Sequence, residues 1–242
     1  MFVRSGQNPL RQVYLAGLPA CVAGLALVGA YSGGIYAIQT TTVAKAMLLF
    51  AAAPFLAAIL GWIFLNEVVK RSTGVAIFVA SIGIAIMVIG QTEGGALIGT
   101  LAGLGSALGF AIFTVALRWG KSADMMPSIL LSGLFAIIIT ICVCWQTGLS
   151  FVIRPNDVGI SMAMGIFQVG AGLILYTLGS KTVPAAELAL LSLAEILLGP
   201  FWVWLVLDER IVINTIIGGV VLLGALMGNA LLTAQQKRPV LR

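Results

Sequence analysis

Residues 44–67 read AKAMLLFAAAPFLAAILGWIFLNE, and residues 186–209 read AELALLSLAEILLGPFWVWLVLDE. Aligned at an offset of 142 residues, the two segments share eight identities over 24 positions. The informative identities are a tryptophan near the end of each copy and the final glutamate, Glu67 in the first and Glu209 in the second, because leucine and alanine match often by chance. The chain therefore contains an internal repeat of an apolar segment that ends on a carboxylate.

The repeat lies within a chain that is apolar throughout. Of its 242 residues, 60% are hydrophobic and 9% are charged, and the mean hydropathy is +1.12. A soluble domain has about 25% charged residues, so lipid must be the solvent for most of this chain. Because a helix needs roughly 18 or more apolar residues to cross a membrane, the sequence predicts an all-α polytopic membrane protein. Its eight transmembrane helices are expected at about 13–38, 43–65, 73–90, 95–117, 127–145, 158–178, 186–207 and 211–233.

The two copies of the repeat are expected to cross the membrane in opposite directions. They lie in the second and the seventh expected helix, which are an odd number of crossings apart. Inverted repeats of this kind are typical of secondary transporters, whose substrate site lies where the repeats meet. Lys and Arg residues number ten on the side that holds both termini and three on the other. We therefore expect a multi-pass protein of the inner membrane with both termini in the cytoplasm.

The composition argues against enzymatic and metal chemistry. The chain has no histidine, which excludes Ser-His and Cys-His triads and histidine-ligated metal sites. Its three cysteines, Cys21, Cys142 and Cys144, fall in apolar stretches with a spacing that suits neither a disulfide framework nor zinc. The sequence contains no phosphate loop and no dinucleotide motif, and its positive charge is spread over the connections. We expect no enzyme activity, no cofactor, no metal and no nucleic-acid partner.

The repeat carries a pattern that resembles a known transporter family. It consists of an apolar helix with an internal proline, a terminal Leu-x-Glu, a short turn and a Gly-rich closing helix. This pattern, in AAAPFLAAILGWIFLNE and again in TVPAAELALLSLAEILLGPFWVWLVLDE, is similar to EamA-type permeases of the drug/metabolite transporter superfamily. The resemblance implies two inverted halves of five helices each, with the first two helices absent from this chain. Residues 1–93 would then be a partial first repeat of three spans, 94–236 a complete second repeat and 237–242 a cytoplasmic tail.

Glu195 is the ionisable residue placed deepest in an expected span. It is the tenth residue of the stretch 186–207, a depth at which a charged side chain costs about 2.5–3.5 kcal/mol. The carboxyl group must be protonated, paired or facing water. It either couples proton movement to solute release or, as a neutral acid, donates a hydrogen bond between helices. The resembling family commonly has a Glu-Pro pair in this helix, whereas this chain has Glu195-Ile196 and a proline displaced to Pro200.

The other candidates for a substrate site share a position near the middle of a span. They are the polar and aromatic residues Gln168, Ser106, Tyr176 and Trp202 and the prolines Pro54 and Pro200. The polar and aromatic side chains are expected to line a small cavity, in which aromatic faces and a few hydrogen bonds hold an organic solute. Each proline frees a backbone carbonyl for a ligand, a water or a neighbouring helix, or is an ordinary kink.

Two further patterns concern charge and packing. Lys45 and Glu187 occupy equivalent positions in the two copies, each near the start of its helix, and both side chains are expected to reach the membrane interface. Closely spaced glycines over 95–109, and Gly224 with Gly228, allow close helix contact. They serve packing either within the bundle or at the face of a homodimer.

Together these observations predict a secondary transporter in the lipid bilayer. It would export a small organic solute, such as an amino acid, across the inner membrane by alternating access, with protons as a further partner if Glu195 titrates. The alternative is a truncated membrane fragment that transports nothing, or a chain whose cavity is completed by a dimer or another partner.

Overall fold

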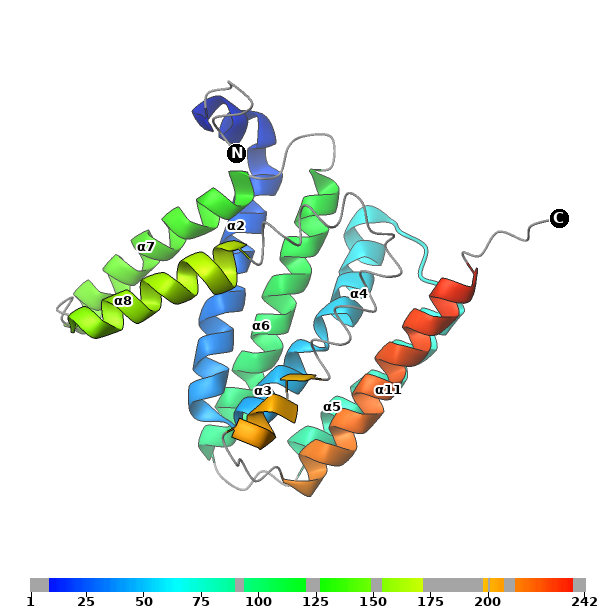
Figure 1. Ribbon diagram of the computed structural model, residues 1–242. Coiled ribbons are helices and arrows are strands. Elements are labelled where there is room, and N and C mark those ends of the chain that lie inside the picture. Colours follow the sequence, from blue (N-terminus) through cyan, green and yellow to red (C-terminus); the bar gives the residue numbers. More distant parts are fainter. Residues whose placement is uncertain are drawn as a thin grey trace.

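The computed structural model describes residues 9–89, 94–120, 127–148, 154–171, 198–199, 201–206 and 212–236. Every regular element in these ranges is a helix (Figure 1). In chain order the helices are α2 (Pro9–Thr40), α3 (Val43–Phe50), α4 (Ala53–Leu65), α5 (Arg71–Val88), α6 (Gly94–Trp119), α7 (Pro127–Thr147), α8 (Pro155–Ala163), the π-helix η1 (Met164–Ala171) and α11 (Ile213–Gln236). Residues 198–199 and 201–206 are helical as well. The expected all-α class is confirmed for the described part of the chain.

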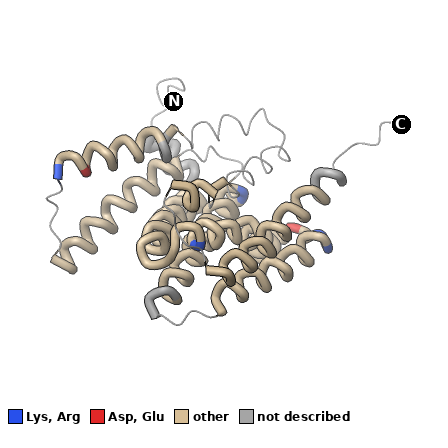
Figure 2. The backbone as a smooth tube through the Cα atoms, turned by 60° about the horizontal axis from the view of Figure 1, so that its bottom comes forward, with Lys and Arg blue, Asp and Glu red and all other residues tan. Residues whose placement is uncertain are grey.

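Six segments of the described chain are long and apolar enough to cross a membrane. They are Gly17–Thr40, Val43–Leu65, Arg71–Val88, Leu97–Trp119, Pro127–Thr147 and Ile213–Leu232. The charged side chains that the structure describes lie within about a turn of a helix end, so the helix interiors carry no charge there (Figure 2). These features are those of a multi-pass membrane protein. The other two expected spans, 158–178 and 186–207, lie largely outside the described residues.

Helix α6 is the centre of the bundle, with α2, α3 and α4 packed against it (Figure 1). The glycines of α6 permit this close approach. A Cβ atom added at Gly109 would lie 2.8 Å from the carbonyl oxygen of Ala26 on α2, and one added at Gly103 would lie 3.0 Å from the side chain of Leu49 on α3. Of the two roles considered for the glycines of this helix, packing within the bundle is therefore the one observed at these positions.

The glycine contact between α6 and α2 predicts a large effect of a small substitution. Gly109→Ala forces the new methyl group against the backbone of Ala26 and Ala30, so the two helices must move apart, at a cost of about 1–3 kcal/mol. We expect the variant to unfold at a lower temperature than the unmodified protein in detergent micelles. Gly105→Ala is the matched control on the same helix, because its added Cβ would meet no atom within 4 Å. Equal unfolding temperatures for the two variants would contradict this packing.

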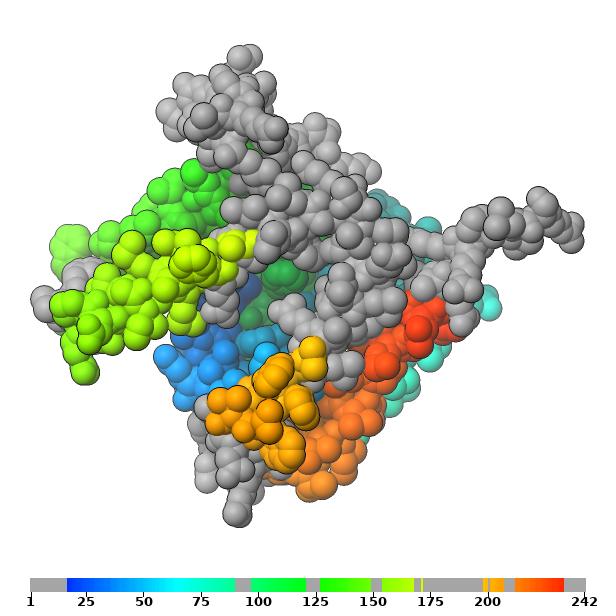
Figure 3. Space-filling view, in the orientation of Figure 1, coloured from blue at the N-terminus to red at the C-terminus, as the bar shows by residue number. Residues whose placement is uncertain are grey.

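Helices α7 and α8 lie at one edge of the molecule (Figure 3). Helix α7 packs against α2 and buries residues of its first turns only, whereas α8 buries none. Large apolar side chains are exposed on both helices and on η1, which follows α8. Examples are Ile137 on α7, Ile160 on α8 and Phe167 on η1. Apolar surface of this extent suits contact with lipid rather than with water.

Helices α5 and α11 form an antiparallel pair (Figure 1). At one end, Oγ1 of Thr73 donates a hydrogen bond to Oδ1 of Asn229 over 3.0 Å. At the other end, Nδ2 of Asn214 donates to the backbone oxygen of Ile89 over 2.9 Å. Residue numbers therefore rise along α5 as they fall along α11. The two hydrogen bonds, one at each end of the pair, both fit this register. Polar side chains that bond across transmembrane helices help to hold them together.

The second span is divided into α3 and α4 by a turn at Ala51–Ala52. Pro54 stands at the start of α4, and a proline has no N–H and clashes with the carbonyl group four residues earlier in a continuous helix. The N–H groups of Phe55 and Leu56 both donate to the carbonyl oxygen of Ala52, each over 3.1 Å. The span therefore consists of two helices with separate hydrogen-bond ladders, and Pro54 marks the junction between them.

Candidate functional site

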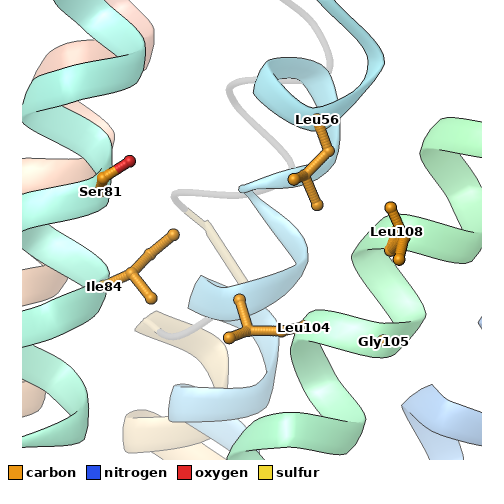
Figure 4. Close-up of a pocket in the computed structure, with 6 residues that line it drawn as sticks. All are labelled: Leu56, Ser81, Ile84, Leu104, Gly105 and Leu108. Carbon is orange, nitrogen blue, oxygen red and sulfur yellow. The ribbon is translucent and has the colours of Figure 1, made fainter. Parts of the chain in front are cut away.

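A cavity of about 370 Å³ lies between α4, α5 and α6 (Figure 4). Leu56 reaches it from α4, Ser81 and Ile84 from α5, and Leu104, Gly105 and Leu108 from α6. Leu56 is the second residue after Pro54, which lies in the first turn of α4. Helices α4 and α5 make few direct contacts with each other, which leaves a space between these two described helices.

The walls of this cavity are almost entirely apolar. The hydroxyl group of Ser81 is the polar side-chain group among the lining residues, and it donates a hydrogen bond to the carbonyl oxygen of Ile77 over 2.9 Å. Its oxygen can still accept a hydrogen bond from a bound molecule. Apolar walls with one or a few polar groups are typical of sites for small organic molecules.

A second cavity of about 540 Å³ continues along the seam between α4 and α5. It is lined by Ile59, Trp62, Asn66, Glu67, Val68, Val69 and Ile77. At its rim, Glu67 accepts a hydrogen bond from Arg118 of α6 across 2.6 Å. Both side chains are about half exposed, so water screens the pair and it adds little to stability. The seam therefore has an apolar interior and a charged mouth.

The sequence predicts that Ser106 lines a cavity, but in the structure its hydroxyl group is bonded to a neighbouring helix. The residue is buried, and its Oγ donates a hydrogen bond of 2.7 Å to the carbonyl oxygen of Ala30 on α2. Its neighbour Gly105 lines the cavity instead. The hydroxyl of Ser106 thus connects α6 to α2.

The bond from Ser106 predicts a stability effect. Ser106→Ala removes the donor while Ala30 keeps its place, and a hydrogen bond between transmembrane helices contributes about 0.6–2 kcal/mol. We expect a lower unfolding temperature for Ser106→Ala than for Ser81→Ala, whose hydroxyl bonds within its own helix. Thermal unfolding of both variants in the same detergent checks this. The opposite order would exclude the bridging role of Ser106.

The other predicted site residues do not meet in the described part of the chain. Pro54 is exposed at the start of α4. Trp202 is 54% exposed and stands edge to face with Phe201, with ring centres 6.0 Å apart. For Gln168 the structure describes only the backbone, in η1. Glu195, Tyr176 and Pro200 lie outside the described residues.

Lys45 departs from its prediction. The sequence predicts that its side chain reaches the membrane interface, but the residue is only 3% exposed. Its position explains the difference, because it lies in the first turn of α3, which packs against α2, α6 and α11. No described residue forms a hydrogen bond with its Nζ. A buried ammonium group of this kind is a feature that hydropathy alone does not reveal.

Comparisons with known proteins agree on one kind of protein. The model of the EamA-like transporter family matches residues 1–89 and 97–231. The chain is also 25% identical over 174 residues to the uncharacterized transporter YwfM of Bacillus subtilis (strain 168). That similarity covers 69% of this chain and 59% of the relative, so it extends over less than two thirds of the relative's length. No solved structure matches the chain.

Proposed function

Because this chain belongs to the EamA-like transporter family, we propose that it is a secondary transporter that exports a small organic solute, such as an amino acid, across the inner membrane. The observation that carries the proposal is the family match in both halves of the chain. The relative from Bacillus subtilis is itself named a transporter. Family and relative point to a transporter and not to an enzyme, and they do not favour the alternative of an inactive fragment.

The register of α5 against α11 supports an inverted repeat. If a two-fold axis relates residues that are 142 positions apart, two residues that meet at the axis must themselves be separated by 142 positions. Ala80 and Leu222 have this separation and are buried in one core cluster. Thr73 and Asn229, which share a hydrogen bond, each lie seven residues from this centre. The register of the antiparallel pair is therefore the one expected if a two-fold axis relates the two copies, and this supports the proposed inverted repeat.

The seam between α4 and α5 supports a path for the solute. It contains two cavities in succession, and one of its walls is α4, the second half of a broken span. Broken helices near the middle of the membrane are a recurrent feature of transporter sites. In this proposal α4 moves relative to α5 and α6, so that the cavity between them opens to one side of the membrane at a time.

The finer elements of the proposal rest on the sequence. Glu195 is the proposed proton-coupling residue, and Gln168, Tyr176, Trp202 and Pro200 are proposed to contribute to the solute site. Both termini are proposed to lie in the cytoplasm. A homodimer through α11 remains part of the proposal, because Cβ atoms added at Gly224 and Gly228 would meet no described atom within 4 Å.

Export in cells tests the proposed direction. Cells that express the chain and cells that carry an empty vector are fed dipeptides, so that amino acids accumulate inside. We expect the expressing cells to release at least one amino acid into the medium faster, with a lower internal concentration. Equal release of all amino acids from both strains, with the protein present in the membrane fraction, would contradict export of amino acids.

A further inference from the structure

Lys45 is a buried lysine at the start of a helix. It lies in the first turn of α3, where Oγ1 of Thr42 caps the helix by accepting a hydrogen bond from its N–H over 3.3 Å. The residue is 3% exposed, and no described residue forms a hydrogen bond with its Nζ. The two acidic side chains that the structure describes, Glu67 and Asp157, are paired with Arg118 and Arg154. The described part of the chain thus supplies no carboxylate for Lys45.

The neighbours of Lys45 on α3 show which helices surround it. One turn later, Leu48 contacts Gly219 of α11, and Leu49 contacts Gly103 of α6. Both leucines share a core cluster with Met87 of α5. Residues three and four positions apart lie on one face of a helix, and long side chains lean toward the helix N-terminus. The lysine side chain therefore extends from the place where α3, α5, α6 and α11 meet, toward the N-terminal end of α3.

The electrostatics of this position favour an anion. An ammonium group without a partner in a medium of low dielectric constant is unstable, and it keeps its proton only when a negative charge or water approaches it. The N-terminus of α3 adds a partial positive charge to the same place. A positive charge in the first turn of a helix is repelled by the helix dipole. Both the dipole and the ammonium group therefore attract a negatively charged partner.

We propose that Lys45 binds the carboxylate group of the transported solute. This inference rests on the proposed function and specifies the class of solute, which is a small organic acid or an amino acid rather than an amine or a neutral molecule. Leu48, Leu49 and Met87, which lie one turn away from Lys45 or pack against that turn, are buried together in an apolar core cluster, and an attraction between ammonium and carboxylate is stronger in such surroundings than at a surface.

Thermal unfolding of the purified protein in detergent tests the site without requiring transport. The probes are matched carboxylates and amides at constant ionic strength, namely L-leucine with L-leucinamide, benzoate with benzamide, and succinate with succinamide. We expect at least one carboxylate, and not its amide, to raise the unfolding temperature by several degrees. Lys45→Met removes this shift. Lys70→Met, at an exposed lysine, is the control and keeps it.

The empty protein provides a second readout. Because Lys45→Met removes a buried charge that lacks a partner, the variant should unfold at a higher temperature than the unmodified protein when no probe is present. A lower temperature would mean that a carboxylate of the chain itself pairs with Lys45, and would overturn the proposal. It would also be overturned if no carboxylate stabilised more than its amide, or if Lys45→Met kept the shift.

Flux measurements separate this inference from the proposed function. A carboxylate that binds through Lys45 but is not transported would support the site and count against the transporter. Transport of a solute without an anionic group, at the same rate in Lys45→Met, would support the transporter and overturn the site.

Discussion

Gly105→Trp should abolish solute flux. Gly105 lines the cavity between α4, α5 and α6, and an added Cβ would meet no atom within 4 Å, so a new side chain at this position begins in open space at the cavity wall. The indole ring would narrow this space of about 370 Å³ from the side of α6. We expect flux into vesicles to fall at least roughly tenfold, as for a loss of about 1.4 kcal/mol in solute binding.

The control for this variant is Gly133→Trp on α7. Gly133 also has no atom within 4 Å of an added Cβ, but it is exposed at the edge of the molecule and lines neither cavity. Both variants should unfold near the temperature of the unmodified protein, and only Gly105→Trp should lose flux. Normal flux in Gly105→Trp would exclude this cavity from the solute path.

Glu195→Gln should abolish flux driven by a pH gradient. Glutamine is similar to glutamate in size and can still form hydrogen bonds, but it cannot release a proton, so coupling to proton movement is lost. We expect a fall of at least roughly tenfold, to the level of vesicles without a gradient. Exchange of labelled for unlabelled solute at equal pH should continue, because it requires no net proton transfer.

Glu187→Gln is the matched control on the same expected span. Glu187 lies near the start of that span rather than at its middle, so its replacement should leave pH-driven flux unchanged. If Glu195→Gln carried solute down the pH gradient as fast as the unmodified protein, proton coupling through this carboxyl group would be wrong.

The sequence predicts well those features that depend on hydrophobicity and on the backbone geometry of single residues. Apolar stretches of membrane length recur in the structure as six candidate spans, because few charged residues are tolerated in lipid. The resemblance to the EamA-type permeases, drawn from the proline-containing repeat, is confirmed by the family match. The proline that interrupts the second span interrupts its helix as well, since Pro54 cannot continue the hydrogen-bond ladder.

The cavity and the buried lysine escape sequence analysis for a physical reason. Leu56 and Leu104 line the cavity, yet nothing in their identity distinguishes them from leucines that face lipid. Ser106 and Ser81 are both serines within spans, but only tertiary packing shows that the first bonds to a neighbouring helix and the second stands at the cavity. Lys45 lies near the end of its span, where a lysine usually reaches the interface. The helix that carries it packs against three others, α2, α6 and α11, and one sequence does not show this packing.

The seam between α4 and α5 has an unexpected charged mouth. The sequence places Glu67 at the end of a repeat unit without indicating a partner, because Arg118 is distant in the chain and belongs to α6. Ion pairs between remote residues follow from the packing of helices, which one sequence does not specify. The repeat itself, by contrast, was visible because both copies retain the same terminal glutamate.

Solute flux by the purified chain is the most direct measurement. The protein is reconstituted into liposomes loaded with unlabelled amino acids, and the uptake of labelled amino acids is followed with and without a pH gradient. Our account predicts uptake of at least one carboxylate-bearing solute that rises in proportion to the protein in the vesicles. Uptake equal to that of protein-free liposomes for every solute, from protein that retains its helical content, would contradict the proposal that this chain is a transporter.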